Sequence, residues 1–493
     1  MTSTPPKSLY FEHMKCVRFH DRFGLSVRLR TASVVLLVVL AIPRAKVHAE
    51  PFTYGADLSF VPWLRANGAV WTAYGVQASP LYLFHQTGWN GVRLRLWHTP
   101  ITGGWEEYHG LDSTLVFAHE IVDEGMPWML DFHYSDTWAD PGKQYTPAAW
   151  EDLDLATLDD SLYNYTRDVI ARCREEGILP TWVQIGNEIN NGLLWPVGQL
   201  YGTDDDAQAW RNYAHLLLAA KRGVLDGAYP DDPPKIVLQY GDGGSVGGAT
   251  WWADHTLGYG VTPDIFGFSF YPWWHGSLGD LRETLNTVAD KYHLPVMVVE
   301  TSYPFTLDWN DNQTNIVGSG TPLPIEYPAT PAGQELFLSD LRDVVREVPG
   351  GLGIGVWLWE PAWITAPTAS SGGENLAVYD FNGAALPALN LPNTESVDEW
   401  RTGGHPSSFM LGIPYPTPTN GSATVTVDQL ASGSATLEVV DLLGRQVRSI
   451  SLSSGAGQHR LTIDLSGEAS GIYFLRLSTP GTTPQTRRIV LVR

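Results

Sequence analysis

Two glutamates stand at the ends of short apolar segments, and their type and placement could do chemistry. Glu188 ends the segment 182–188, and Glu300 ends the segment 295–300. A short apolar run that closes on a polar residue is typical of a buried strand whose last side chain leaves the core. Two facing carboxylates can cleave a glycosidic bond, because one protonates the leaving oxygen while the other attacks the anomeric carbon or activates water.

The region from about residue 51 to 392 alternates strand-like and helix-like segments that would position these side chains. We expect strands at 54–58, 91–97, 127–133, 182–188, 235–240, 265–271, 295–300 and 353–359, and helices at 114–124, 158–176, 207–225, 278–292 and 331–347. Eight strands alternating with helices predict an α/β fold, a parallel (β/α)8 TIM barrel. A doubly wound open sheet is the alternative, but no glycine-rich phosphate turn follows the first strand.

The active site of such a barrel lies at the C-terminal ends of its strands. The predicted ends carry polar and aromatic residues, namely Asp57, Arg95, Trp97, His133, Glu188, Tyr271, Glu300 and Trp359. Chemistry-bearing side chains therefore gather where the fold would place a site.

The charge balance excludes one class of function. The 493 residues include 31 Lys and Arg and 53 Asp and Glu, a formal charge of −22. Residues 1–49 hold eight of the basic and two of the acidic residues, so the chain without them has 23 and 51 and a formal charge of −28. Nucleic-acid binding needs a basic surface, which this chain lacks. Cys173 is the one cysteine after residue 49, so we expect no intramolecular disulfide and no cysteine-based metal site.

The two ends of the chain differ from the predicted barrel. Four arginines precede the apolar stretch 32–42, and a small-residue site ends at Ala49, which predicts a secretory signal at 1–49; an uncleaved membrane anchor is the alternative. Residues 403–493 contain no Trp and show short alternating runs at 423–427, 435–440, 459–465, 471–477 and 487–492. These runs predict a small β-sandwich. The catalytic barrel would then span 50–402.

Several motifs in the predicted barrel resemble glycoside hydrolase family 53, the endo-β-1,4-galactanases of clan A. The matching segments are 55–59, 92–97, 130–144, 184–189, 300–303, 359–363 and 386–389. The 15-residue segment 130–144 is the most specific of them. One departure lies on the fifth strand, where the family often shows a histidine near Gln239.

The resemblance implies a role for individual residues. Glu188 takes the place of the acid/base and Glu300 that of the nucleophile. Asn187 would bind the sugar hydroxyl next to the reacting carbon, and Tyr271 would hold Glu300 through its hydroxyl. Arg95 and His133 would support the carboxylates. The remaining candidates for sugar contact are Trp97, Asp136, Trp138, Trp359 and Trp363. Each of these tryptophans could equally pack in the core, and Asp136 could brace its loop.

The implied function is a secreted retaining endo-β-1,4-galactanase that acts on pectic galactan as a monomer and without a cofactor. Another clan A endo-glycanase, for mannan or β-glucan, and a non-catalytic glycan-binding protein are the alternatives. Some family members hold a structural calcium ion; here the acidic segment 308–312 could supply ligands, but the segment 364–374 is poor in acids.

The C-terminal region resembles the sorting domain of the type IX secretion system. Its motifs lie at 415–418, 441–445, 471–473 and 487–490, in the expected order. The resemblance implies recognition by secretion machinery, export through the periplasm, and release or attachment at the outer cell surface. A generic β-sandwich accessory domain is the alternative.

Overall fold

The computed structural model describes residues 52–200 and 206–393, and residues 409–493 except 412–413, 415–418, 430–433, 442–444, 454–456 and 479–484. The predicted signal at 1–49 and the predicted boundary at 402 lie outside the described residues.

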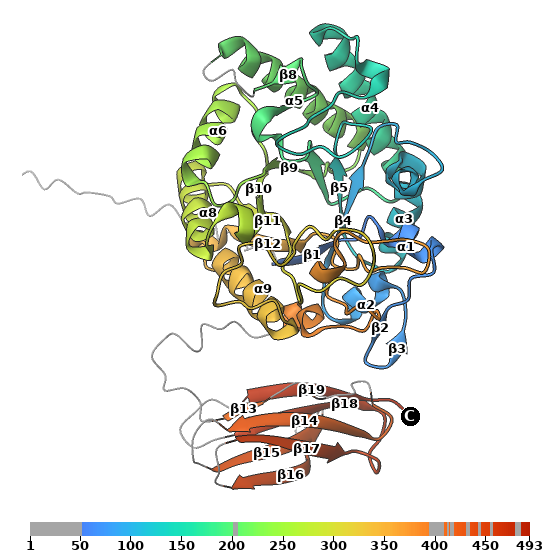
Figure 1. Ribbon diagram of the computed structural model, residues 1–493, viewed down its shortest axis with the longest axis vertical. Helices are drawn as coiled ribbons and strands as arrows, with labels where there is room; N and C mark the ends of the chain where they lie inside the picture. The colour runs from blue at the N-terminus through green and yellow to red at the C-terminus, as the bar shows by residue number, and fades with distance from the viewer. Residues whose placement is uncertain are drawn as a thin grey trace, which may run out of the picture. The chain divides into compact units, whose positions relative to one another are not determined.

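The first described part is the predicted (β/α)8 barrel (Figure 1). Eight parallel strands close in the order β1-β12-β11-β10-β9-β6-β5-β4. Their bounds are β1 Thr53–Asp57, β4 Gly91–Leu96, β5 Trp128–Phe132, β6 Trp182–Ile185, β9 Lys235–Tyr240, β10 Ile265–Phe270, β11 Val296–Thr301 and β12 Gly353–Leu358. Each predicted barrel strand exists, and each ends near the predicted residue.

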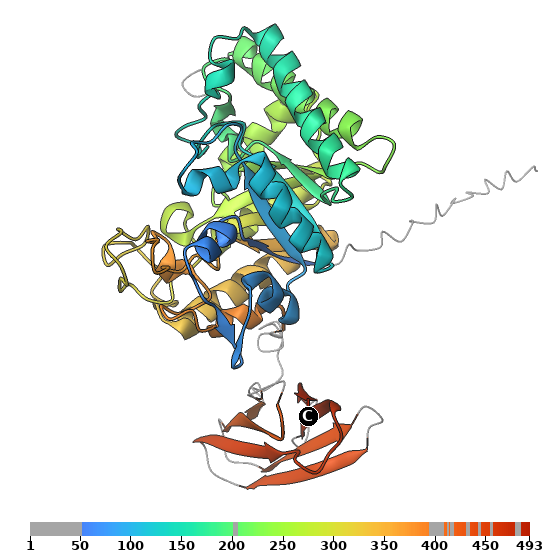
Figure 2. The same ribbon diagram turned by 90° about the vertical axis from the view of Figure 1, so that its right-hand side faces the viewer.

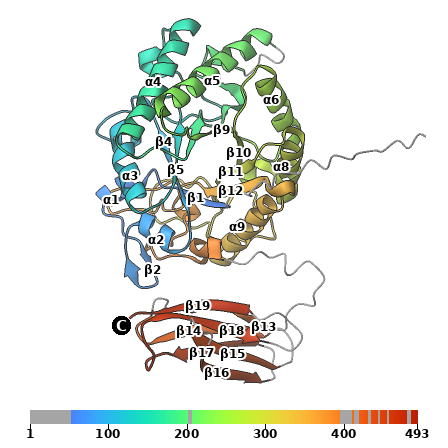
Figure 3. The same ribbon diagram turned by 180° about the vertical axis from the view of Figure 1, so that it is seen from behind.

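Helices surround the strands, as Figures 1 and 3 show from opposite sides. They are α1 Val61–Ala66, α2 Pro80–Gln86, α3 Leu111–Asp123, α4 Leu155–Glu175, α5 Ala207–Ala228, α6 Val246–Gly258, α7 Pro272–His275, α8 Leu278–Tyr292 and α9 Pro331–Arg346. Two small hairpins, β2 Thr72–Ala73 with β3 Val76–Gln77 and β7 Gly192–Leu193 with β8 Gly198–Gln199, were not expected. Among the described residues, none of the helices has the length and apolar character needed to span a membrane.

The lower half of the barrel interior is an apolar plug. It contains Met129, Trp182, Val237, Ile265, Met297, Val299, Ile354 and Trp357, all buried. The indole of Trp357 lies across the position that a side chain at Gly55 would occupy: a Cβ there would meet the ring at 1.9 Å. Glycine on β1 therefore lets this tryptophan fill the barrel.

A polar layer lies above the plug, toward the C-terminal ends of the strands. On β5, β6 and β9 the next inward positions carry Asp131, Gln184 and Gln239, and all three side chains are fully buried. Gln184 donates to Asp131 at 2.6 Å and to Gln239 at 2.7 Å. Because buried polar groups need partners, these hydrogen bonds hold the three side chains in nearly fixed positions just below the strand ends.

A β-bulge on β11 sets the direction of Glu300. Met297 and Val299 both belong to the interior plug, so strict alternation would turn Glu300 toward the helices. The register with β10 shifts here, and Ser269 pairs with Glu300 one residue out of step with the pairs before it. The extra residue returns Glu300 to the barrel mouth, as bulges near functional sites do.

The C-terminal part forms two antiparallel sheets with their own apolar core (Figure 2). One sheet has the order β13-β14-β17 and the other β16-β15-β18-β19. The strands are β13 Phe409–Leu411, β14 Ser422–Gln429, β15 Ser434–Asp441, β16 Gln446–Ser453, β17 Gly457–Asp464, β18 Gly471–Ser478 and β19 Gln485–Leu491. The five predicted runs fall on β14, β15, β17, β18 and β19, whereas β13 and β16 were not predicted.

Candidate active site

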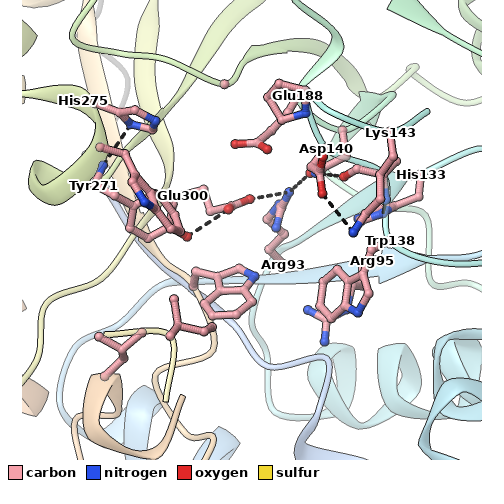
Figure 4. A pocket seen from close by; sticks show the side chains of 18 of the residues that line it. Arg93, Arg95, His133, Trp138, Asp140, Lys143, Glu188, Tyr271, His275 and Glu300 are labelled. Atoms are coloured by element: carbon pink, nitrogen blue, oxygen red, sulfur yellow. Dashed lines mark hydrogen bonds and ion pairs between the residues drawn. The ribbon is translucent and has the colours of Figure 1, made fainter. Parts of the chain in front are cut away.

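A cleft of about 510 Å³ lies at the C-terminal ends of the barrel strands (Figure 4). Most of the predicted site residues line it: Arg95, His133, Trp138, Asn187, Glu188, Tyr271, Glu300, Trp359 and Trp363. Trp97 and Asp136 do not. The topology therefore brings together side chains that are widely separated in the sequence.

The backbone just after β6 holds Glu188 in an unusual conformation. Gly186 has φ +88°, and Glu188 itself has φ +49°, in the left-handed region that non-glycine residues rarely adopt. The surroundings stabilise this turn: the N–H of Glu188 donates to Oε1 of Gln239 at 3.0 Å. The amide of Gln144 donates to the carbonyl oxygens of Asn187 and Glu188 at 2.7 and 3.3 Å. Such over-determined strain is a common feature of functional sites.

Glu300 is surrounded by donors. The hydroxyl of Tyr271 donates to its Oε1 at 2.9 Å, the contact that the family resemblance implied. The amide of Gln239 donates to its Oε2 at 3.3 Å, and Nη2 of Arg93 lies 3.5 Å from the same oxygen. Figure 4 shows Glu300 between Tyr271 and Arg93, with Glu188 across the cleft.

The two carboxyl groups differ in electrostatic environment. Burial raises the pKa of Glu188 well above its ordinary value, and the negative charge of Glu300 raises it further. Burial also raises the pKa of Glu300, but Arg93 and the hydrogen bonds from Tyr271 and Gln239 oppose that rise. Glu188 is therefore the carboxyl that keeps a proton, and Glu300 is the one that ionises first. Different environments for two carboxyls are what an acid and a nucleophile require.

The arginine beside Glu300 is Arg93, not Arg95, and this corrects the sequence-based expectation. Arg93 is fully buried and bonds Asp57 at 2.7 Å, Asp131 at 2.8 Å and the side-chain oxygen of Asn187 at 2.8 Å. Both arginines point inward from β4, so the alternation of the strand could not tell them apart.

Arg95 instead organises one wall of the cleft. Its Nη1 pairs with Glu360 at 2.6 Å. Its guanidinium contacts the faces of both Phe60 and Trp138, 4.5 and 4.4 Å from the ring centroids. Trp363 stacks on Phe60 at a centroid distance of 4.3 Å. Cation–π contacts of a desolvated arginine are among the stronger ones, so this stack gives the aromatic wall a fixed position.

Asn187 and His133 line the cleft, but their contacts are with its framework. The side-chain amide of Asn187 donates to the carbonyl of Ala139 at 2.8 Å. His133 accepts a hydrogen bond from the N–H of Ala139 at Nδ1, so its Nε2 carries the proton and faces Asp131 at 3.1 Å. His133 therefore acts on the partner of Arg93 and on the loop after β5, not on Glu188 or Glu300 directly.

Trp97 and Asp136 have structural surroundings. Trp97 is fully buried and packs behind the wall against Trp105 and Trp138. The carboxylate of Asp136 accepts hydrogen bonds from the N–H groups of Thr99 at 2.8 Å and Ala148 at 2.9 Å. It thus braces two loops, which is the alternative that the sequence left open.

The structure adds Trp274, His275 and Lys143 to the cleft, which the sequence did not single out, and it also places Asp140 there, an acid that the sequence suggested would lie near the cleft. Trp274 and His275 come from the short helix α7, and the side chain of Trp274 is 63% exposed. The salt bridge between Lys143 and Asp140, at 3.2 Å, stands at the rim. The aromatic run directly after the strand end at 271 was the available signal for α7.

The oxygen-rich segment 308–312 does not fit a calcium site. Asp311 accepts hydrogen bonds from the N–H groups of Gln313 and Ser371, both at 2.7 Å, and from the hydroxyl of Thr365. Glu374 accepts from the N–H of Asn310 at 2.6 Å. Oxygens surrounded by N–H and O–H donors are not arranged to coordinate a cation. Within the described ranges, no group of three or more His, Cys, Asp or Glu has a metal-binding arrangement.

Comparison with known proteins covers both parts of the chain. Residues 414–492 match the model of the secretion system C-terminal sorting domain, which marks the protein for export and a secreted or cell-surface location. The arabinogalactan endo-β-1,4-galactanase of Cellvibrio japonicus is 35% identical over 374 residues, covering 73% of this chain and 96% of that relative.

Two solved structures resemble the barrel. The GH53 catalytic domain of Ignisphaera aggregans is 34% identical with a TM-score of 0.63, covering 69% of this chain and 95% of its own. A fungal β-1,4-galactanase is 32% identical with a TM-score of 0.60, covering 69% of this chain and 99% of its own. Residues 53–391 match the model of glycosyl hydrolase family 53. The chain therefore belongs to glycosyl hydrolase family 53.

Proposed function

We propose that this chain is a secreted endo-β-1,4-galactanase that hydrolyses β-1,4-galactosidic bonds of type I arabinogalactan with retention of configuration. Family membership and the activity named for its Cellvibrio japonicus relative support the substrate. The observation that carries the mechanism is the buried pair Glu188 and Glu300, whose environments favour a protonated and an ionised carboxyl.

In the first step, a carboxylate oxygen of Glu300 attacks the anomeric carbon. The bond from that carbon to the leaving oxygen breaks, and the proton of Glu188 moves to this oxygen, so the leaving galactoside departs neutral. Arg93 and Tyr271 hold Glu300 ionised and oriented before the attack. The product of this step is a covalent galactosyl ester on Glu300.

In the second step, Glu188 acts as a base. It takes a proton from water, the water oxygen attacks the anomeric carbon, and the ester bond to Glu300 breaks. Glu188 is protonated again and the cycle closes. Asn187 uses one hydrogen of its amide on Ala139, so the second hydrogen can donate to the sugar hydroxyl beside the reacting carbon.

The aromatic wall provides the polysaccharide contacts. Trp359 is tilted against Trp138 and packs edge to face against Trp363, so the three rings form a continuous group along the cleft. Flat apolar faces with a few polar groups between them suit the C–H faces of a sugar chain. Both carboxyl groups and the whole wall come from one barrel, so we propose that a monomer acts alone. The chemistry requires no cofactor, and we assign no structural calcium.

The test is release of reducing sugar by the purified full chain on linear β-1,4-galactan, with mannan and β-glucan in parallel. We expect activity on galactan only, with the β-anomer as the first product in ¹H NMR. Glu188→Gln and Glu300→Ala should each lower kcat on galactan by at least about 10³-fold. Glu335→Gln, a half-buried glutamate of α9 outside the cleft, is the matched control.

Each other outcome assigns a different function. Activity on mannan or β-glucan alone would make the chain another clan A endo-glycanase. Binding of galactan without hydrolysis by the folded protein would make it a glycan-binding protein. Substantial activity in either glutamate variant would overturn the assigned roles.

A further inference from the structure

A chain of hydrogen bonds joins the two carboxyl groups through residues that have no role in the proposed mechanism. Gln239 lies on β9 and Ser269 on β10, and both are fully buried. Gln239 contacts Glu300 directly and reaches Glu188 through Ser269. The backbone N–H of Glu188, which donates to Gln239, fixes the direction of each hydrogen bond in this series.

The amide of Gln239 has only one possible orientation. Its Oε1 accepts a hydrogen bond from the backbone N–H of Glu188 at 3.0 Å, and a backbone N–H can only donate. The same oxygen accepts a second hydrogen bond, from Nε2 of Gln184 at 2.7 Å. Gln184 is fixed in turn, because the same Nε2 also donates to the carboxylate of Asp131 at 2.6 Å. If the amide of Gln239 were flipped, its NH2 group would face two donors, the N–H of Glu188 and the Nε2 of Gln184.

The other end of Gln239 must therefore donate. Its Nε2 has two hydrogens and two acceptors within reach, Oγ of Ser269 at 2.9 Å and Oε2 of Glu300 at 3.3 Å. Since Ser269 accepts at its oxygen, its own hydrogen is free to donate onward. It does so to Oε1 of Glu188, at 2.5 Å.

The consequence concerns the place of one proton. If Ser269 donates to Oε1 of Glu188, the acidic proton of Glu188 must lie on Oε2. On Glu300 the arrangement is different. Its Oε1 accepts a hydrogen bond from the hydroxyl of Tyr271, and its Oε2 accepts one from the amide of Gln239 and faces Arg93. Both oxygens of Glu300 accept, so this carboxyl is held without a proton.

We infer that Ser269 and Gln239 are positioning residues that confine the transferable proton to Oε2 of Glu188 and keep Glu300 ionised. This inference rests on the proposed function, since it refines the acid/base step. When the leaving oxygen takes its proton, the bond that breaks is the O–H bond at Oε2. When water is activated, its proton returns to Oε2. Ser269 donates to Oε1 throughout and exchanges no proton.

Other titratable groups lie near Glu188 without making this contact. They are Glu300 on β11, Asp140 after β5, Arg93 on β4 and Tyr271 after β10. Glu300 and Asp140 oppose ionisation of Glu188, and Arg93 favours it. The hydroxyl of Ser269 is the group that donates a hydrogen bond to the carboxylate itself. Its removal should therefore change the ionisation of Glu188 while leaving the surrounding charges in place.

The experiment is the pH profile of kcat/KM on β-1,4-galactan for the full chain and for Ser269→Ala. Loss of a hydrogen bond to the ionised form makes Glu188 keep its proton to higher pH, so we expect the alkaline limb to move up by about one to two pH units. The acidic limb, which reports Glu300, should move less. Ser269→Thr keeps a hydroxyl and should restore the wild-type limb. Ser339→Ala, a buried serine of α9, controls for loss of stability alone.

Gln239→Glu is the second variant, because it keeps the size and the acceptor end of the side chain. Its second oxygen would face Ser269 and Glu300, so we expect both limbs of the profile to move to higher pH. If Ser269→Ala does not fold, this variant decides. An active wild type whose limbs stay in place in the folded variants would overturn the inference. A wild type that is inactive on galactan would instead overturn the proposed function.

Discussion

The buried guanidinium of Arg93 offers a quantitative test of how the cleft controls Glu300. We consider Arg93→Lys, which keeps the charge but loses the planar fork. Nη2 of Arg93 lies 3.5 Å from Oε2 of Glu300. With an effective dielectric constant of about 20, a unit charge at that distance favours the carboxylate by about 4.7 kcal/mol.

Lysine carries its charge at a single atom that cannot reach all the partners of Arg93. If this atom stays with Asp57 and Asp131 and lies about 2 Å farther from Glu300, its contribution falls to about 3 kcal/mol. The loss of about 1.7 kcal/mol corresponds to a rise of about 1.2 units in the pKa of Glu300. Because Glu300 must be ionised to attack in the proposed mechanism, the acidic limb of kcat/KM should move up by about one pH unit.

The assay is hydrolysis of galactan across the pH range, together with urea unfolding. Arg93→Lys also loses one or two charge-assisted hydrogen bonds, so the free energy of unfolding should fall by about 2–4 kcal/mol. Arg342→Lys is the matched control, because Arg342 is equally buried, on α9, and pairs with Asp343. The control should lose stability with no change in the limb. If the acidic limb of Arg93→Lys coincides with that of the wild type, Arg93 holds the barrel together but does not set the ionisation of Glu300.

Three further predictions follow from single contacts. Burial and the charge of Glu300 raise the pKa of Glu188, so Glu188 in the folded state holds a proton that the unfolded chain releases above about pH 4.3. The free energy of unfolding therefore falls as the pH rises from there. Glu188→Gln should thus raise the free energy of unfolding at pH 7 by about 1–3 kcal/mol in urea titrations; a decrease would contradict this. Trp274→Ala removes an exposed aromatic face of the cleft, so KM for galactan should rise about three- to tenfold with kcat unchanged; an equal loss in kcat would place Trp274 at the reacting centre. Glu360→Gln removes the negative charge that faces the buried Arg95 at 2.6 Å and should cost about 3–5 kcal/mol in urea unfolding. A loss below about 1 kcal/mol would show the charge pair to be unimportant.

The strands of the barrel were predictable because their sequences are nearly continuous apolar runs. Parallel strands covered on both faces need such runs, and their ends are marked by a change to polar residues such as Glu188. The strand β16 lacks this signal, because Val447 is out of step with Ile450 and Leu452 and no single alternation runs through the sequence 446–453. Its pairing with β15, not its own composition, makes it a strand.

The contacts inside the cleft were less predictable than the set of residues that line it. The bulge that turns Glu300 inward leaves no trace in an apolar run that reads as regular alternation. Arg93 and Arg95 occupy equivalent inward positions, and only the height of each within the barrel decides which one meets Glu300. Trp97 and Trp138 both belong to matching motifs, but the path of the loop after β5 places Trp138 in front and Trp97 behind. Gln239 was noted only as a departure from the family pattern, although it contacts both Glu188 and Glu300.

Contacts between the first and last strands of the barrel complete the cleft. The N–H of Phe60, just after β1, faces the carboxylate of Glu360, just after β12, and the ring of Phe60 stacks on Trp363. A chain lacking β12 would contain both Glu188 and Glu300 but neither Glu360 nor this part of the aromatic wall. Contacts between residues 300 positions apart form only after the intervening chain is ordered. Hydrolysis is therefore a property of the fully closed barrel, and a partly folded chain on its way out of the cell would have no assembled cleft with which to cut a polysaccharide.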